Sequence, residues 1–127
     1  MNLERYRSVI PGWSEFVEAA SRPEPTVFRV RTGRTDPDAV RARLEEQGYR
    51  LRALDGMPSF FQVEEEPRPV SFTLEHWAGL LYVQQASTGV AAPVLAPEAG
   101  ERVLDLCSAP GGKTTHAADL MGDRGTL

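Results

Sequence analysis

Arg102 to Met121 read RVLDLCSAPGGKTTHAADLM, and this stretch indicates the fold of the second half of the chain. The run from Arg102 to Cys107 is short and apolar, as in a buried parallel strand. A helix is expected from about Gly112 to Met121, with Gly122 and Gly125 as its stop signal. Strand, glycine turn and helix in succession form the first half of a βαβ unit, whose turn is the usual ligand site of doubly wound sheets.

The turn between this strand and helix has the composition of an anion site. A helix N-terminus offers free backbone N–H groups and roughly half a positive charge. Gly111 and Gly112 let the backbone approach a ligand closely. Lys113, the one lysine of the sequence, stands in the first helical turn, where the helix dipole disfavours a cation by roughly 0.3–1 kcal/mol. We therefore expect a carboxylate or phosphate beside it, with a solvated lysine as the alternative.

Two common nucleotide patterns do not fit the turn. A P-loop requires G-x-x-x-x-G-K-[ST], and Gly112-Lys113-Thr114 matches its end, but Cys107 stands where the first glycine is needed. The dinucleotide pattern G-x-G-x-x-G fails as well, because the turn reads SAPGGK. A triphosphate-binding function is thus disfavoured.

The residues before this stretch predict a compact α+β unit. Residues 3–20 read as a helix broken at Pro11-Gly12, and Asp36-Pro37 starts a second helix that Gly48 stops. Thr26 to Thr32 alternates apolar and basic residues, as a half-buried strand does. Two further short strands are expected around the Asp55-Gly56 turn, at residues 49–54 and 60–63.

A domain boundary is predicted near residue 72. The segment EEEPRP, Glu64 to Pro69, is charged and proline-rich, which indicates a surface loop or a hinge. Residues 1–72 then form one unit, and residues 73–127 begin a second. In the second unit we expect Trp77 and Tyr82 in the core and a short helix that ends near Pro97.

Composition gives no global case for nucleic-acid binding. The chain of 127 residues is 41% apolar and 25% charged, as in soluble globular proteins, and its formal net charge is −4. Residues 22–52 are locally basic, with eight arginines against five acids. An RNA-facing strip or an ordinary solvated surface explains this equally well. The arginines of the possible strip are Arg29, Arg31, Arg34, Arg50 and Arg52.

Localisation and redox chemistry follow from what the sequence contains. Cys107 is the one cysteine, which excludes an internal disulfide and a zinc site built from several thiolates. Charged residues interrupt the first twenty positions, and no apolar run approaches membrane-spanning length. We expect a cytoplasmic protein without a membrane partner.

The motif DLCSAPGGKTTH resembles the first methyltransferase motif of the Sun (Fmu) family of RNA 5-methylcytosine methyltransferases. The segments WSEFVEAASRPEPTVFRV, EHWAGLLYVQQAST and APEAGERVLDL are also similar to the family, so the resemblance covers nearly the whole chain. Two departures are Arg31, where asparagine is common, and Ser108, where alanine is usual. The resemblance places seven residues on the turn that binds S-adenosylmethionine, namely Cys107, Ser108, Ala109, Pro110, Gly111, Gly112 and Lys113.

On this resemblance the fold is α/β overall. Residues 1–72 would be an α+β module of the RNA-recognition type, and residues 73–127 the start of a class I, Rossmann-like methyltransferase domain that stops after its first β–α unit. The implied reaction transfers a methyl group from S-adenosylmethionine to carbon 5 of cytosine in rRNA or tRNA, with rRNA the favoured substrate. A non-catalytic RNA-binding or assembly module is the alternative.

The family's reaction implies residues that this chain does not contain. Carbon 5 of cytosine is a poor nucleophile, so such enzymes add a cysteine thiolate to carbon 6 first. Both family cysteines lie well after the first motif, and Cys107 does not match either of them. We therefore expect the 127-residue chain to hold no catalytic residue, to be inactive alone, and to self-associate or leave its C-terminal end partly disordered.

Two polar residues near the turn call for simpler interpretations. Asp105 is expected to shape the turn rather than to take part in catalysis. His116 lies one turn into the helix, where a lone histidine is usually structural or solvated, and it receives no assignment.

Overall fold

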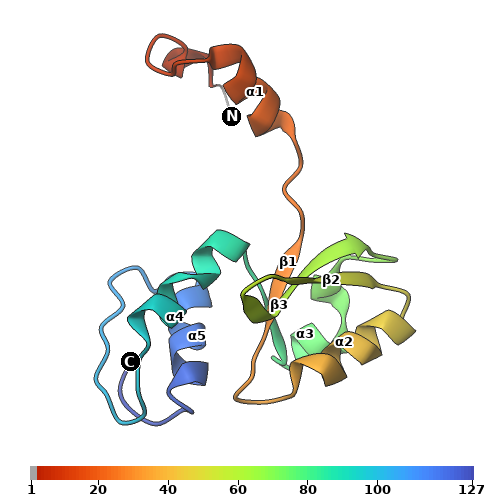
Figure 1. Ribbon diagram of the computed structural model, residues 1–127, viewed down its shortest axis with the longest axis vertical. Helices are drawn as coiled ribbons and strands as arrows, with labels where there is room; N and C mark the ends of the chain where they lie inside the picture. The colour runs from red at the N-terminus through yellow and green to blue at the C-terminus, as the bar shows by residue number, and fades with distance from the viewer. Residues whose placement is uncertain (1–2) are drawn as a thin grey trace.

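The computed structural model describes residues 3–127, and a four-stranded antiparallel sheet forms its centre. The strand order is β2-β3-β1-β4 (Figure 1). The strands are β1 (Val27–Val30), β2 (Arg50–Leu54), β3 (Met57–Glu65) and β4 (Leu81–Val83). Strand β1 is therefore flanked on both sides, by β3 and by β4.

The hairpin of β2 and β3 forms where the sequence predicts it. The two strands pair around the Asp55-Gly56 turn, where Gly56 has a φ of 71° that favours glycine. Strand β3 is longer than expected, because it continues to Glu65 through the start of the charged segment. The added residues pair with β2, since Arg50 lies opposite Glu65.

Helix α2 (Pro37–Glu46) covers one face of the sheet, and its prediction is confirmed. The Asp36 carboxylate accepts a hydrogen bond from the Ala39 N–H at 3.0 Å, and proline follows at the first helical position. Its apolar side chains join one hydrophobic core with residues of the sheet. The fully buried members of that core are Phe28, Val30, Val40 and Leu44.

The prediction that Trp77 lies in the core is wrong, because its side chain is 79% exposed. Trp77 ends α3 (Leu74–Trp77), a helix of a single turn whose N-cap is Thr73. This turn directs Thr73 and Glu75 inward, and the Glu75 carboxylate accepts hydrogen bonds from Arg43 on α2 and from Gln47, the C-cap of α2. With its polar side anchored, the turn leaves Trp77 facing solvent.

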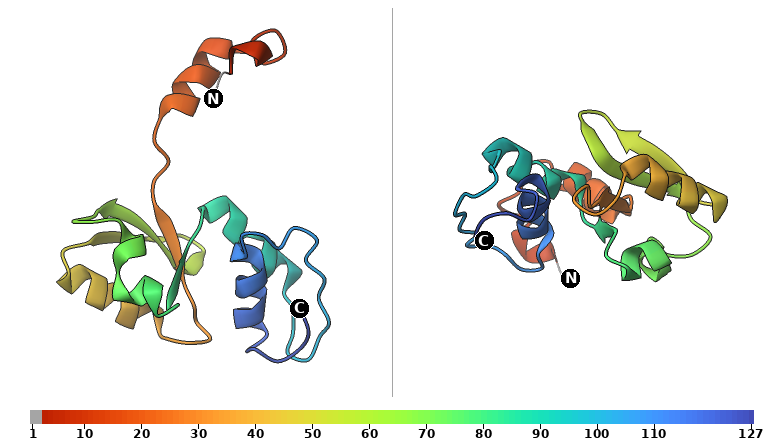
Figure 2. Two further views of the ribbon diagram at one scale, coloured as in Figure 1. Left: turned by 180° about the vertical axis from the view of Figure 1, so that it is seen from behind. Right: turned by 90° about the horizontal axis from the view of Figure 1, so that it is seen from below.

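The chain crosses from β4 to two helices that pack against each other. After a 3₁₀ turn (Ala86–Gly89) comes α4 (Ala91–Leu95), which ends near Pro97 as predicted. Helix α5 (Gly112–Leu120) lies beside α4, on the opposite side of the sheet from α2 (Figures 1 and 2). Strand β4 thus takes part in the sheet although it follows residue 72, and the predicted domain boundary stays a prediction.

The buried strand expected at residues 102–107 is not formed. One parallel bridge joins Arg102 to Thr126, while Leu104 is 81% and Leu106 is 86% exposed. A parallel strand depends on neighbouring strands and on helices over both faces, and within residues 3–127 this segment has the single bridge. The apolar run therefore lies on the surface, as expected for a β–α unit without partner strands.

Helix α1 (Trp13–Ser21) confirms the helix predicted after Pro11-Gly12, but it stands away from the sheet (Figure 2). A 3₁₀ turn (Glu4–Tyr6) precedes it, and none of the α1 residues is buried. Trp13 and Phe16 contact each other on one face, with ring centroids 5.6 Å apart. Across residues 3–127 the structure contains no helix that combines the length and apolar character needed to cross a membrane.

Candidate functional site: the glycine-rich turn and the charged cluster behind it

Gly111 and Gly112 are both required by the turn, for different reasons. Gly111 is the N-cap of α5 and has a φ of 110°, a conformation that side chains with a Cβ rarely adopt. Gly112 packs closely against β4 and the residue after it. A Cβ at this position would lie 2.8 Å from Gln84 Oε1 and 3.4 Å from Tyr82 Cε1.

Asp105 holds the two ends of the turn together, as the sequence predicts. Its carboxylate accepts hydrogen bonds from the Cys107 N–H at 2.8 Å and from Thr114 Oγ1 at 2.7 Å. The bond from Thr114 first, and then that from Cys107, lowers the pKa of this carboxyl group, with a smaller contribution from the charge of Lys113. Asp105 is therefore a structural carboxylate that stays ionised.

Tyr82 anchors the turn from the sheet side, a role that the sequence did not predict. Its hydroxyl donates to the Pro110 carbonyl oxygen at 2.8 Å. The side chain is half-buried rather than part of the core, because it spans the space between β4 and the turn. No local signal identifies such a contact, since the two residues are 28 positions apart.

The seven residues assigned to the turn are accessible from outside. Cys107, Ser108, Ala109 and Pro110 are exposed, while Gly111, Gly112 and Lys113 are half-buried. The expectation that Cys107 closes a buried strand is wrong, because that strand is absent and the thiol is exposed. An open pocket of about 270 Å³ adjoins Asp105, Cys107 and Lys113, and its remaining lining is largely apolar.

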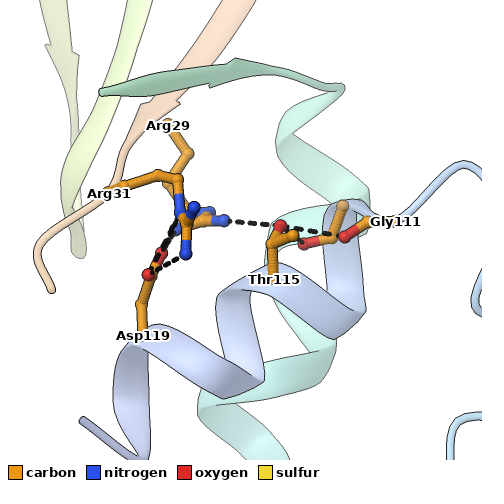
Figure 3. A network of polar contacts seen from close by, with 6 residues as sticks. Arg29, Arg31, Gly111, Thr115 and Asp119 are labelled. Atoms are coloured by element: carbon orange, nitrogen blue, oxygen red, sulfur yellow. Dashed lines mark hydrogen bonds and ion pairs between the residues drawn. The ribbon is translucent and has the colours of Figure 1, made fainter. Parts of the chain in front are cut away.

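Behind the turn, Arg29 of β1 and Arg31, which follows that strand, bind one carboxylate of α5 (Figure 3). Arg29 is 1% exposed and its Nη1 donates to Asp119. Arg31 donates to Asp119 Oδ1 through Nη2 at 2.8 Å and through Nε at 3.1 Å. Burial lowers the pKa of the Arg29 guanidinium, and the hydrogen bond and charge of Asp119 oppose this effect. Arg29, Arg31 and Asp119 are called the charged cluster below.

The prediction of a half-buried strand is therefore corrected, and the RNA-facing strip, one of the two explanations for the arginines, loses Arg29 and Arg31. All four residues of β1 are buried, because α2 covers one face of this central strand and α5 covers the other. Arg29 and Arg31 point into the molecule, and both form ion pairs with Asp119. At the far edge of the sheet, Arg50 and Arg52 form ion pairs with Glu64, and Arg50 also with Glu65.

His116 lies beside the charged cluster and is buried, with 6% of its surface exposed. Its ring contacts the Phe60 ring at a centroid distance of 5.6 Å, and its Nδ1 has no hydrogen-bond partner among the described residues. Burial, and secondarily the charge of Arg29, lower the pKa of His116 to about 4, although Asp119 opposes the shift. The histidine is therefore neutral near pH 7.

The free energy of unfolding is expected to fall as the pH is lowered from about 6.5 towards 4. In this window the unfolded chain protonates His116, whose ordinary pKa is 6.5, whereas the folded chain does not until about pH 4. Above that window both states are neutral and the residue contributes nothing. Urea denaturation at pH 7 and pH 5 checks this, with His116→Gln expected to show a smaller loss than the wild type. Equal losses in both proteins would contradict the prediction.

Comparisons with known proteins agree with the resemblance of the turn. The family model described as 16S rRNA methyltransferase RsmB/F matches residues 92–127. A ribosomal RNA small subunit methyltransferase F of Vibrio campbellii is 33% identical over 132 residues, covering 98% of this chain and 28% of that protein. The 26S rRNA (cytosine-C(5))-methyltransferase nsun-1 of Caenorhabditis elegans is 36% identical over 114 residues, covering 89% of this chain and 17% of that protein.

A solved structure extends this similarity to the fold. A methyltransferase homolog protein from Pyrococcus horikoshii matches with a TM-score of 0.79 and 35% identity, covering 85% of this chain and 35% of that chain. The chain thus spans about a quarter of the length of the bacterial relative named above. The chain is therefore similar in sequence to the RsmB/F rRNA methyltransferases and in fold to a methyltransferase homolog, and the resemblance that its glycine-rich turn carries is confirmed.

Proposed function

We propose that the protein takes part in the transfer of a methyl group from S-adenosylmethionine to carbon 5 of cytosine in rRNA. The relatives support the proposed reaction and substrate. Their names describe rRNA methyltransferases, and one of the names specifies cytosine-C(5). The observation that supports a donor site is the turn of residues 107–113. Every residue of this turn is exposed or half-buried, and the turn leads directly into the N-terminus of α5.

The residues of the turn suit the amino-acid end of this donor. Helix α5 begins at Gly112 and presents the unpaired N–H groups of its first turn, where a carboxylate is stabilised. Gly111 leaves no side chain over these groups, and Lys113 places a cation in the same turn. The adjoining apolar pocket beside Asp105 and Lys113 offers room for the rest of a small ligand.

The chemistry of the transfer assigns this chain a binding role. When bound, S-adenosylmethionine supplies an electrophilic methyl group. Cytosine becomes reactive at carbon 5 once a thiolate has added to carbon 6. The one cysteine of the sequence, Cys107, lies in the donor turn and its backbone is held by Asp105, so we assign it no nucleophilic role. We assign no catalytic residue to the described chain.

An RNA-binding module without a donor site is the less favoured function. Its main support in the sequence was the strip of five arginines. In the structure four of them form ion pairs: Arg29 and Arg31 with Asp119, and Arg50 and Arg52 with Glu65 and Glu64, respectively. The net charge of −4 adds no attraction for phosphates.

Titration of the full-length natural protein with S-adenosylmethionine is expected to show saturable binding that Gly111→Ala weakens at least tenfold. A Cβ at a φ of 110° forces the turn out of its conformation and moves the N–H groups of α5. Lys113→Ala is expected to weaken binding by a smaller factor, about two- to fivefold, since a single charge in the first helical turn contributes modestly. Isothermal titration calorimetry measures both.

Gly56→Ala is the matched control for this titration. Gly56 also has a positive φ, of 71°, and a Cβ there meets nothing within 4 Å. The variant therefore carries a similar backbone strain in the distant β2–β3 hairpin and is expected to bind the donor as the wild type does. Absence of donor binding by the wild type, or magnesium-dependent binding of ATP in its place, would contradict the proposed function.

A further inference from the structure

The charged cluster is connected to the donor turn through a single side chain, Thr115 (Figure 3). The Nη2 of Arg29, the terminal nitrogen that does not bind Asp119, donates to Thr115 Oγ1 at 3.1 Å. Thr115 Oγ1 lies 2.8 Å from the carbonyl oxygen of Gly111, the N-cap of α5. A buried arginine of the central strand is thus two hydrogen bonds away from the glycine that shapes the turn.

The direction of these hydrogen bonds follows from the donors present. A guanidinium can only donate, so the Thr115 oxygen must accept from Arg29. The hydroxyl then has one proton to give, and the Gly111 carbonyl at 2.8 Å is a better acceptor than the Gly112 carbonyl at 3.3 Å. Arg29 therefore occupies a lone pair of the hydroxyl oxygen while its proton goes to the Gly111 carbonyl, which also accepts the Thr115 N–H at 2.9 Å.

A threonine in a helix often donates to a carbonyl four residues earlier without any further consequence. Here the same hydroxyl is also held from the other side, by a side chain that is itself fixed. Arg29 is 1% exposed and bound to an Asp119 side chain with no exposed surface. Hydrogen bonds in such a chain polarise and strengthen one another, so the Gly111 carbonyl is held more firmly than by a mobile hydroxyl.

The charged cluster also carries an unbalanced charge. Two guanidinium groups face one carboxylate, which leaves a net charge of +1 in a largely buried position. His116 does not add to it near pH 7, because its pKa is lowered to about 4. In a partly desolvated site this charge is screened less than one on the surface, and it has the sign that favours an anion at the N-terminus of α5.

We propose that Arg29 is a positioning residue for the methyl-donor site, acting through Thr115 on the Gly111 carbonyl. The relay holds the N-cap glycine, so that the N–H groups at the start of α5 already face the donor carboxylate before it binds. This inference rests on the proposed function, because it names the support behind the same turn. It makes the antiparallel sheet part of the donor site, although no residue of the sheet belongs to the turn.

Thr115→Val tests the relay with little change in shape, since it replaces the hydroxyl by a methyl group. In the full-length natural protein we expect a three- to tenfold loss of affinity for S-adenosylmethionine by calorimetry. We also expect, without donor and relative to the intrinsic rate, at least threefold faster hydrogen exchange of the amide at position 115, because this N–H donates to the Gly111 carbonyl at 2.9 Å. Thr115→Ser keeps the hydroxyl and is expected to restore both quantities to within twofold of the wild type.

Two further variants separate the relay from a general loss of stability. Arg29→Lys keeps a cation opposite Asp119 but lacks the second arm that reaches Thr115, so it is expected to change both quantities as Thr115→Val does. Thr88→Val removes a hydroxyl that donates to the Gln85 carbonyl at 2.8 Å in an exposed 3₁₀ turn. It is expected to leave donor affinity and turn exchange unchanged.

The two readouts keep this inference distinct from the proposed function. A wild type that binds no donor overturns the function itself and, with it, the donor-directed role of Arg29. A wild type that binds the donor, together with a Thr115→Val variant of equal affinity or equal turn exchange, overturns the relay and leaves the function standing. Loss of affinity in Thr115→Ser as large as in Thr115→Val also overturns the relay, because the hydroxyl would then not be the cause.

Discussion

Replacing Asp119 by alanine is expected to lower the free energy of unfolding by about 3–5 kcal/mol, because the change leaves a buried arginine without its anion. The Asp119 side chain has no exposed surface, and it is the carboxylate of both Arg29 and Arg31. Without it, the buried Arg29 keeps only the weaker bond to Thr115. Urea denaturation followed by circular dichroism measures the difference.

Glu18→Ala is the matched control, because it also removes an acidic partner from an arginine. Glu18 on α1 and Arg22, the C-cap of this helix, form an ion pair at 2.6 Å, with side chains 69% and 71% exposed. Exposed pairs of this kind contribute about 0–1 kcal/mol, so the control is expected to unfold almost as the wild type does. A loss below about 1 kcal/mol for Asp119→Ala would show that Arg29 finds water or another acceptor in the folded protein.

Phe28→Ala is expected to lower the free energy of unfolding by about 3–5 kcal/mol. Phe28 has no exposed surface on the central strand, and its ring stacks on Phe61 of β3 with centroids 5.6 Å apart. Truncation removes this buried area and leaves a cavity between the sheet and α2, which the surrounding strands fill only partly. Chemical denaturation gives the value.

Trp77→Ala is the control for the loss of an aromatic ring. Trp77 is 79% exposed, and truncation of surface side chains usually changes stability by less than about 0.5 kcal/mol. The pair of variants therefore tests the correction made for Trp77 as well as the position of the core. A larger loss for Trp77→Ala than for Phe28→Ala would show that the core lies elsewhere.

Elements with strong local signals could be predicted from the sequence. Asp36-Pro37 and Gly48 mark the two ends of α2, and the Asp55-Gly56 turn marks the hairpin, because caps and tight turns depend on residues within a few positions. The glycine-rich turn could be located in the same way. Its glycines at the start of a helix are required by backbone geometry, and Gly111 does have the positive φ of a glycine-specific position.

Features that depend on distant partners could not be predicted from local patterns. The alternation of β1 suggested an exposed basic face, whereas α5 covers that face and Asp119 binds its arginines. The apolar run before the turn suggested a buried strand, whereas the described chain pairs it only through the bridge from Arg102 to Thr126. In both cases burial is decided by what the rest of the fold places alongside, not by the segment.

The sequence alone thus determined α2, the β2–β3 hairpin, the resemblance to the rRNA methyltransferases and the location of the glycine-rich turn, since each depends on neighbouring residues. Only the tertiary structure decided that β1 is the central strand and that the turn is supported from the sheet. Arg29 and Asp119 are 90 positions apart, so folding alone brings these opposite charges together, and burial makes their pairing necessary for stability.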